Sequence, residues 1–205
     1  MILENKCKKC KRFGEKLFLK GERCYSPKCP LLRRTKSNRR NAFSKGSSEY
    51  SRQLLEKQKI KTYYGLNERQ LKRYFQEAFN QKGSTPEILA KMLEMRFDSV
   101  IYNAGFAPYR CLARQLASHG HFLLNGRRHD ISSAVLKVND LICVRPQSQN
   151  KIIFNGLREK LKKAKTLSWL EVNPDQLSVR IIAEPALEEL NLPFDFSLVV
   201  EFYSR

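Results

Sequence analysis

Apolar residues recur at the spacing of a helix face over most of residues 48–120. The first helix is predicted over 48–64, and Gly65 provides its stop. A second helix begins after Asn67, a favourable N-cap residue, and ends by Gly83. Its predicted inward stripe comprises Leu71, Tyr74, Phe75, Ala78 and Phe79.

Three shorter helices are predicted after the second one. Thr85 can cap the first of them and is followed by a proline, which suits the first helical position. Asp98 is expected to cap the next helix, which stops at Gly105. Pro108 is expected to open the last helix, and Gly120 ends it. The stripes on these helices indicate core packing.

From residue 121 the spacing changes to that of β-strands. Residues 121–124 predict a short strand, and the pair Asn125-Gly126 is a strong signal for a two-residue hairpin turn. Residues 127–129 begin the return strand, and 141–145 predict a third strand. We therefore expect two helices followed by a small antiparallel sheet over 98–146.

The remaining chain combines a basic helix with strand-like runs. Residues 151–165 carry a net charge of +5 and predict a helix around Leu157 and Leu161. The tail contains two runs that resemble strands, 178–182 and 197–203, separated by turns that contain proline.

These elements predict an α+β fold in five parts. The parts are an arm with four cysteines (1–34), a basic linker (35–48), a helical domain (49–97) against which parts of 166–205 pack, a small module of two helices and an antiparallel sheet (98–150), and a basic helix with C-terminal strands (151–205).

Charge narrows the classes of function. The chain of 205 residues has 39 Lys and Arg but only 20 Asp and Glu, a net charge of +19. Such a charge favours binding to a polyanion, most often a nucleic-acid backbone, with an anionic membrane as the alternative. Residues 1–45 carry +12 and residues 166–205 carry −5, which suggests nucleic acid at one end and a different contact, such as a protein, at the other.

No secretion signal and no apolar run of about 18 residues is visible, so we expect a cytoplasmic protein in a reducing compartment. Cysteines there more often bind metals than form disulfides. Cys7 and Cys10 form one close pair and Cys24 and Cys29 a second, which is typical of a structural zinc site with four thiolates. An iron–sulfur cluster, two disulfides or four reduced thiols are the alternatives.

The other cysteines, Cys111 and Cys143, lie in apolar patterns and are expected to be buried thiols. A second metal site that joins Cys111 to His119 and His121 is disfavoured, because a helix end and a strand start rarely converge in that way. A closed four-cysteine site has no open coordination position, and the chain has no nucleophile elbow, phosphate loop or zinc-protease motif. We therefore expect no enzymatic activity.

Basic side chains on several elements are candidates for RNA binding. Arg110 and Arg114 lie four residues apart and so share one helix face. With the hairpin residues Arg127 and Arg128 they are expected to form one surface. The full candidate set is Arg12, Lys20, Arg23, Lys28, Arg33, Arg34, Arg39, Arg40, Arg52, Lys57, Lys59, Lys61, Arg69, Arg73, Arg110, Arg114, Arg127 and Arg128.

Several segments together resemble one known family. The cysteine segment 7–29, the stretch 55–70, the segments 96–106 and 113–119, and the Asn125-Gly126-Arg127 turn are similar to bacterial-type ribosomal protein four of the small subunit, in its zinc-binding variant. The closing residues 201–205 are similar as well. The resemblance covers nearly the whole chain.

The resemblance implies a structural protein that binds the 5′ domain of small-subunit rRNA and nucleates assembly of the subunit body. It further implies neighbours in small-subunit proteins five and three, a place beside the channel by which mRNA enters, and an influence on translational accuracy. Three alternatives remain open: a translational repressor, a zinc-dependent DNA-binding regulator, and an RNA-modifying enzyme with a borrowed RNA-binding module.

Overall fold

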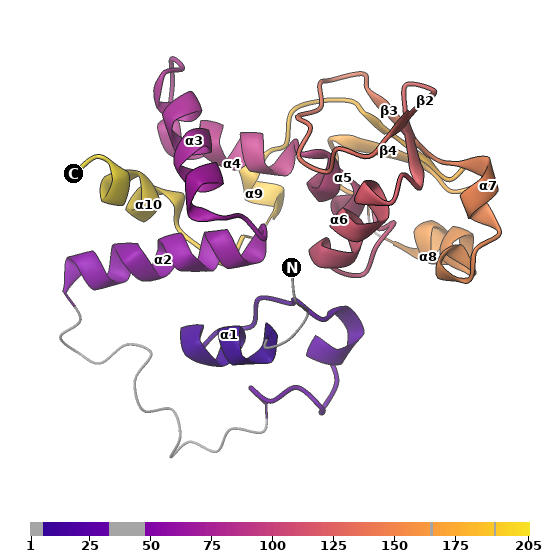
Figure 1. Ribbon diagram of the computed structural model, residues 1–205. Coiled ribbons are helices and arrows are strands. Elements are labelled where there is room, and N and C mark those ends of the chain that lie inside the picture. Colours follow the sequence, from indigo (N-terminus) through magenta and orange to yellow (C-terminus); the bar gives the residue numbers. More distant parts are fainter. Residues whose placement is uncertain (1–5, 33–47, 165, 191) are drawn as a thin grey trace. The chain divides into compact units, whose positions relative to one another are not determined.

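The structure is a computed structural model that describes residues 6–32, 48–164, 166–190 and 192–205. The chain divides into two compact units (Figure 1). Unit 1 comprises residues 1–90 and 192–205, and unit 2 comprises residues 91–191. No helix in the described part of the chain is long and apolar enough to cross a membrane.

Unit 1 is built from helices that begin largely where the sequence predicts. Its elements are α1 (Lys6–Phe13), the 3₁₀ turn η1 (Gly21–Cys24), α2 (Glu49–Tyr63), α3 (Glu68–Phe79), most of α4 (Thr85–Glu94) and α10 (Phe196–Tyr203). Ser48 caps α2 by accepting a hydrogen bond from the Ser51 N–H. Asn67 forms a complete capping box with Gln70 at the start of α3.

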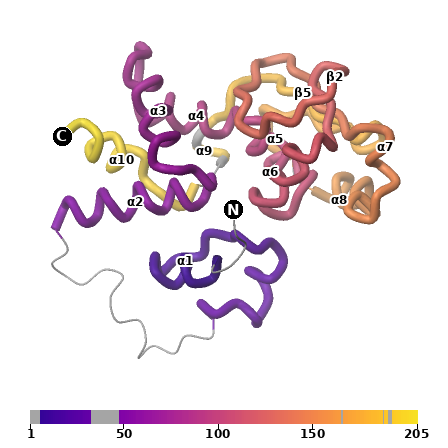
Figure 2. Tube along the Cα trace, in the orientation of Figure 1, coloured from indigo at the N-terminus to yellow at the C-terminus, as the bar shows by residue number. Residues whose placement is uncertain are grey.

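Residues 197–203 were predicted to form a strand. This prediction is wrong, because they form helix α10. Asp195 caps this helix by accepting the Ser197 N–H over 2.8 Å. Phe196 and Val199, which are three residues apart, are buried on one face. Figures 1 and 2 show α10 alongside α2, so packing of this face overrides the strand propensity of its β-branched residues.

Two further predictions within the helices need correction. Phe79 ends α3 and is 60% exposed, although it was expected in the inward stripe. Asp98 does not cap α5 (Phe97–Asn103), because the N-cap position is Arg96 and Asp98 lies in the first turn. The carboxylate of Asp98 binds arginines instead. Helix α6 (Arg110–Ser118) begins after Tyr109, two residues later than predicted.

Unit 2 places helices and turns around an antiparallel sheet, which confirms the mixed helix and antiparallel-sheet class. The sheet has five strands in the order β2-β1-β3-β5-β4. They span β1 (Phe122–Leu124), β2 (Arg127–His129), β3 (Leu141–Val144), β4 (Leu170–Asn173) and β5 (Ser178–Ile181). The other elements are α5, α6, α7 (Pro146–Gln149), the 3₁₀ turn η3 (Ile152–Phe154), α8 (Leu157–Lys163) and α9 (Leu187–Leu190).

The predicted hairpin is present with its expected turn. Asn125 and Gly126 have φ angles of 49° and 81°, the left-handed pair that a two-residue hairpin turn of this type requires. Leu124 pairs with Arg127 across the turn, and Phe122 pairs with His129. The hairpin therefore fixes which residues of β2 face each side of the sheet.

The sheet extends beyond the segment predicted for the small module. Strand β5 pairs with β3, with Ile142 opposite Val179, and β4 completes the edge. Strand β4 was not predicted, and residues 170–181, which lie beyond the boundary expected at residue 150, supply two of the five strands. Residues 166–191 thus belong to unit 2 and not to the helical domain.

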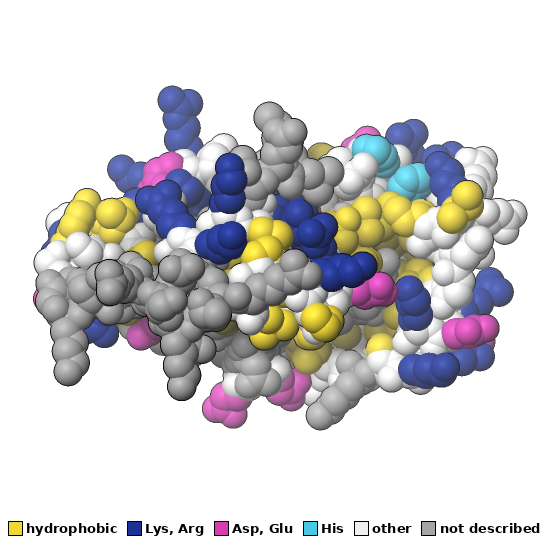
Figure 3. Space-filling model, turned by 90° about the horizontal axis from the view of Figure 1, so that it is seen from below, with side chains coloured by type: hydrophobic (Ala, Val, Ile, Leu, Met, Phe, Trp, Pro, Cys, Tyr) yellow, Lys and Arg dark blue, Asp and Glu magenta, His cyan; other side chains and the backbone are white. Residues whose placement is uncertain are grey.

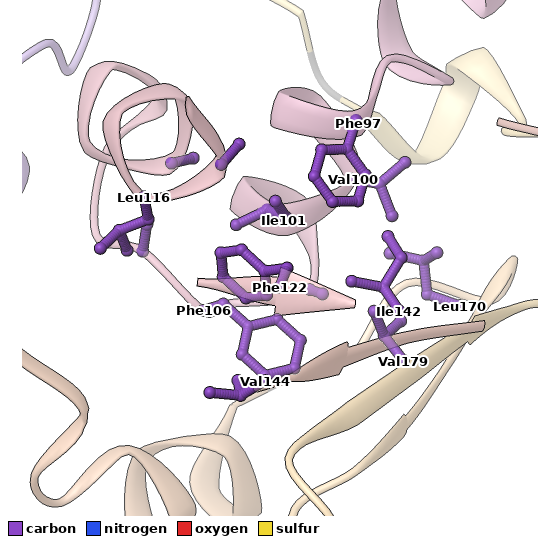
Figure 4. Close-up of a cluster of buried hydrophobic side chains, with 14 of the residues drawn as sticks. Phe97, Val100, Ile101, Phe106, Leu116, Phe122, Ile142, Val144, Leu170 and Val179 are labelled. Atoms are coloured by element: carbon purple, nitrogen blue, oxygen red, sulfur yellow. The ribbon is translucent and has the colours of Figure 1, made fainter. Parts of the chain in front are cut away.

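The core of unit 2 lies between α5, α6 and the sheet. Figure 4 shows Phe97, Val100 and Ile101 of α5 directed toward Phe122 of β1 and Ile142 of β3. Phe122 is fully buried and makes edge-to-face contacts with Phe97, Phe106 and Phe154. The predicted apolar residues of the basic helix, Leu157 and Leu161, also join this core.

Candidate nucleic-acid interface

The four cysteines of the arm line one small cavity. Cys7 and Cys10 lie in α1, Cys24 ends η1, and Cys29 follows in the next turn. They surround a cavity of about 20 Å³ together with Lys16, Phe18, Pro30 and Leu31. Cys10, Cys24 and Cys29 are buried. The predicted convergence of the two pairs is thus present in the fold.

Hydrogen bonds and charges around the sulfurs suit a cation. The Lys20 N–H donates to Cys24 Sγ over 3.4 Å. Burial raises the pKa of the Cys10 thiol, a backbone hydrogen bond from Leu17 opposes this rise, and the three neighbouring cysteines add to it. Bringing four thiolates together therefore needs a compensating positive charge.

The arrangement of donors stops short of a metal site. Among the described residues, no group of three or more His, Cys, Asp or Glu side chains is arranged so that it could hold a metal ion. This finding extends to Cys111, His119 and His121, for which a second site was disfavoured. The donor chemistry of the arm suits zinc, but the described donors are not grouped as a metal site requires.

The candidate cations of the arm lie at the surface where the structure describes them. Arg12, Arg23 and Lys28 are exposed, and Lys20 is half-buried. The candidates Arg33, Arg34, Arg39 and Arg40 lie outside the described residues. Three of the four candidate cations in the described part of the arm are therefore exposed to solvent.

The candidate RNA-binding cations on helices α2 and α3 differ in exposure. Arg52, Arg69 and Arg73 are exposed, and Arg73 lies 3.4 Å from Glu77 one helical turn away. Lys57 and Lys59 are buried, which corrects their prediction as RNA contacts. A buried ammonium requires an internal partner, and each of the two has one.

Glu68 of α3 is the internal partner of Lys57. It accepts hydrogen bonds from Lys57 Nζ (2.7 Å), Lys61 Nζ (3.1 Å) and Tyr203 Oη (2.9 Å). Partial burial would raise the pKa of Glu68, but the bonds from Lys57, Tyr203 and Lys61 outweigh burial and lower the pKa to about 2. Lys61 is thus a structural ion-pair residue, although it keeps partial exposure.

Lys59 joins the arm to α2. Its Nζ lies 2.6 Å from Glu56 Oε1 and 3.0 Å from Glu15, a residue of the arm. Glu56 is itself buried and accepts the Asp195 N–H ahead of α10. The charge of Lys59 thus serves the packing of unit 1 and is not available to RNA.

The two arginines of α6 are both held by carboxylates. Arg110 Nη2 lies 2.7 and 3.0 Å from the carboxylate oxygens of Glu94, whose side chain is fully buried. Arg114 donates through Nε (2.7 Å) and Nη2 (2.6 Å) to Asp98, which Arg96 also binds. The two predicted contacts do share one helix face, but Arg110 is only 11% exposed and Arg114 26%.

The hairpin carries the most accessible candidates of unit 2. Arg127 and Arg128 are exposed on β2. The guanidinium of Arg128 lies over Gly120, where an added Cβ would be 2.6 Å from Nε. The absence of a side chain at Gly120 therefore makes room for Arg128 beside the end of α6.

Sequence reasoning missed the cations that follow β3. Lys151, Arg158, Lys160 and Lys163 are exposed, and Arg145 is half-buried. The sequence did contain a signal for these cations, because no Asp or Glu that could neutralise them occurs within 99–129 or within 141–158. On the face in Figure 3, Lys and Arg side chains occupy several areas, with histidine side chains near some of them.

Comparison with known proteins decides the family. The family described as "Ribosomal protein S4/S9 N-terminal domain" matches residues 2–94, and the "S4 domain" matches residues 95–142. A protein of Acetivibrio thermocellus named "Small ribosomal subunit protein uS4" is 43% identical over 97% of this chain and 96% of its own length. The chain belongs to the uS4 family.

Other members show the same relationship along the whole chain. The uS4 proteins of Pelotomaculum thermopropionicum and Clostridium botulinum are 44% and 43% identical, and each alignment covers 97% of this chain and 96% of the relative. The uS4 family is structural and not enzymatic, so the prediction of no enzymatic activity is confirmed. The readings as an RNA-modifying enzyme or a DNA-binding regulator are thereby set aside.

Proposed function

We propose that this chain binds the 5′ domain of small-subunit rRNA and nucleates assembly of the subunit body. As a uS4 protein it is a structural, rRNA-binding component of the ribosome, and hence cytoplasmic. The observation that carries the finer proposal is the distribution of exposed cations over both units. Arg12, Arg52 and Arg69 lie in unit 1, and Arg127 and Arg128 lie in unit 2.

Cations spread over many elements suit recognition of a folded RNA junction. Arg and Lys bind phosphates and set the register of a protein on RNA, whereas RNA helices are recognised mainly by shape. A DNA-reading protein would instead concentrate its contacts on one recognition helix. If 6–10 phosphates are neutralised, the affinity should fall by a factor of roughly 10³–10⁵ between 50 and 200 mM salt.

Buried carboxylates hold the α6 arginines in position for RNA binding. Asp98 holds the guanidinium of Arg114 through two donors while a quarter of the side chain stays exposed. A guanidinium held in this way loses less side-chain entropy when a phosphate contacts it. Arg110 is more deeply enclosed, and its main role is to neutralise Glu94.

We also propose one structural zinc ion bound by Cys7, Cys10, Cys24 and Cys29. Support comes from their common cavity, the burial of Cys10, Cys24 and Cys29, and the Lys20 N–H directed at Cys24 Sγ. A bound zinc ion would neutralise part of the thiolate charge and fix the arm around it. Native mass spectrometry tests this proposal, because one zinc should bind and should be lost in Cys24→Ser but not in Cys111→Ser. An iron–sulfur absorption spectrum would contradict it.

The partners proposed beyond rRNA are small-subunit proteins five and three and the mRNA in the channel by which it enters. Support for a protein partner comes from the acidic balance of residues 166–205, where RNA contact is disfavoured. Influence on translational accuracy would follow from such contacts, because they couple this chain to the path of the message.

Reconstitution tests the assembly role directly. Small-subunit rRNA would be assembled with all other small-subunit proteins, with and without this chain. Omission should arrest the particle before the body forms, and later addition should restore its sedimentation. Normal sedimentation without this chain would contradict the proposed function.

A further inference from the structure

Two acid-free stretches of unit 2 meet at His121. Residues 99–129 and 141–158 contain no Asp or Glu. Strand β1 from the first stretch pairs with β3 from the second, with Phe122 opposite Val144. Beyond this pair, the Arg145 N–H donates to the His121 carbonyl over 2.9 Å. The sheet register therefore places His121 beside the segment that begins at Arg145.

The imidazole of His121 is fixed in place by that segment. Its Nδ1 lies 2.9 Å from Ser148 Oγ, and Ser148 is buried. The Ser148 carbonyl accepts the Lys151 N–H over 3.0 Å, and the Phe154 ring meets the imidazole edge-on at 5.9 Å. The bond at Nδ1 leaves Nε2 without a hydrogen-bond partner among the described residues.

The groups that face His121 are cationic or neutral. The His119 ring lies 6.1 Å away at the end of α6, and Arg145 and Lys151 flank α7. Partial burial lowers the pKa of His121, and the charges of Lys151, His119 and Arg145 lower it further. Within the described ranges, none of these four side chains forms an ion pair with a carboxylate.

We propose that His121, with His119, Arg145 and Lys151, forms a binding site for an RNA phosphate group. This site rests on the proposed rRNA function and adds to the surface of α6 and the hairpin. Two fixed charges and a held imidazole without an internal counterion suit a phosphate, which accepts several charge-assisted hydrogen bonds at once. The serine at Nδ1 leaves Nε2 as the nitrogen that donates to the phosphate.

Phosphate binding at this site must be linked to protonation. In the free protein partial burial and the neighbouring cations lower the pKa of His121 and favour the neutral imidazole, whereas a bound phosphate favours imidazolium. The pKa of His121 is therefore higher in the complex than in the free protein. RNA binding takes up a proton, and affinity rises as the pH falls through this interval, tenfold for each unit by which RNA raises the pKa.

The test is a titration of the full-length protein with a 5′-domain rRNA fragment. Calorimetry in PIPES and in Tris at pH 7 measures the protons taken up, and anisotropy from pH 5.5 to 8 measures the affinity. His121→Asn removes the titrating ring while its amide can still bond Ser148. His129→Gln is the matched control, because the chain has only three histidines and His129 lies on β2.

The wild type and His129→Gln should take up protons on binding, and His121→Asn should lose most of this uptake. Arg145→Gln and Lys151→Gln should each weaken binding and reduce the salt slope by about one. Unchanged proton uptake and affinity in His121→Asn would overturn the site. Selective loss of binding to polyglutamate, with RNA binding intact, would overturn the RNA assignment in favour of an acidic protein. Failure of the wild type to prefer the fragment would overturn the proposed function itself.

Discussion

Tyr203 donates its hydroxyl hydrogen to the Glu68 carboxylate over 2.9 Å, joining the last turn of α10 to the first turn of α3. The same Tyr203 ring stacks on Phe75 at 5.0 Å. Residues 135 positions apart in the sequence thus fasten the C-terminal helix to the helical domain. A half-buried, stacked ring and a charge-assisted bond make Tyr203 the anchor of α10.

Replacing Tyr203 by Phe should destabilise unit 1 modestly. The substitution keeps the stacked ring and removes only the bond to Glu68, so we expect a loss of about 1 kcal/mol in the free energy of unfolding. Urea denaturation measures this loss. Tyr50→Phe is the control, because Tyr50 is half exposed and also contacts an α10 ring, that of Phe202. Equal effects of the two substitutions would contradict the anchor role.

Glu68 should make the stability of unit 1 sensitive to acid. The folded-state pKa of Glu68 is about 2, below its ordinary value of 4.5. A lowered folded-state pKa adds stability that is full above about pH 4.5 and is lost as the pH falls toward 2. Because the side chain is 45% exposed, screening reduces this contribution to roughly 1 kcal/mol.

Unfolding of the wild type and of Glu68→Gln at pH 6 and pH 3 measures this contribution. The wild type should be more stable at pH 6, and the difference should shrink at pH 3. Because Glu68→Gln removes only the titrating carboxylate, a change in the difference between the two pH values reports that group. A difference between the two proteins that is independent of pH would contradict the assignment.

Glu94 should be far more important for stability than other acids on α4. Its buried carboxylate accepts hydrogen bonds from Arg110 and from Asn103 at 2.6 Å. Glu94→Ala leaves the enclosed Arg110 charge without this partner, which should cost about 3–5 kcal/mol. Glu87→Ala on the exposed first turn of α4 should cost less than about 1 kcal/mol. Similar losses for both variants would contradict the buried ion pair.

Gly120 and Gly126 allow backbone strain to be separated from displacement of Arg128. Both have positive φ, 67° and 81°, so alanine should cost about 1 kcal/mol or more at either position. Only at Gly120 does the added Cβ meet the Arg128 guanidinium. Gly120→Ala should therefore weaken rRNA binding several-fold, as Arg128→Gln does, whereas Gly126→Ala should not. Equal rRNA affinity for the two alanine variants would show that the position of Arg128 does not matter.

Local signals in the sequence predicted the local structure well. The helix start near Ser48, the cap at Asn67 and the turn at Asn125-Gly126 depend on hydrogen bonds or φ angles within a few residues, and all three are present. The type of the 197–203 run and the existence of β4 depend on what each segment packs against. Neither was predicted, because their partners α2 and β5 are not encoded in the local pattern.

In the candidate interface, too, features set by nearby residues were predicted, whereas those set by distant partners were not. The convergence of the four cysteines followed from their spacing, and the exposure of Arg127 and Arg128 followed from their place on a hairpin. The burial of Lys59 did not, because one of its two partners, Glu15, is 44 residues away. Counting cations therefore identifies a polyanion-binding protein, but only the fold separates the cations that pair internally from those that face solvent.

The most direct test of the central claim is competition binding at near-physiological salt. The full-length protein would be offered a 5′-domain fragment of small-subunit rRNA together with transfer RNA at equal mass concentration. We predict a preference of about a hundredfold or more for the fragment, which corresponds to about 2.7 kcal/mol. Equal affinity for the two RNAs would mean that net charge alone drives binding and would contradict specific recognition of the 5′ domain.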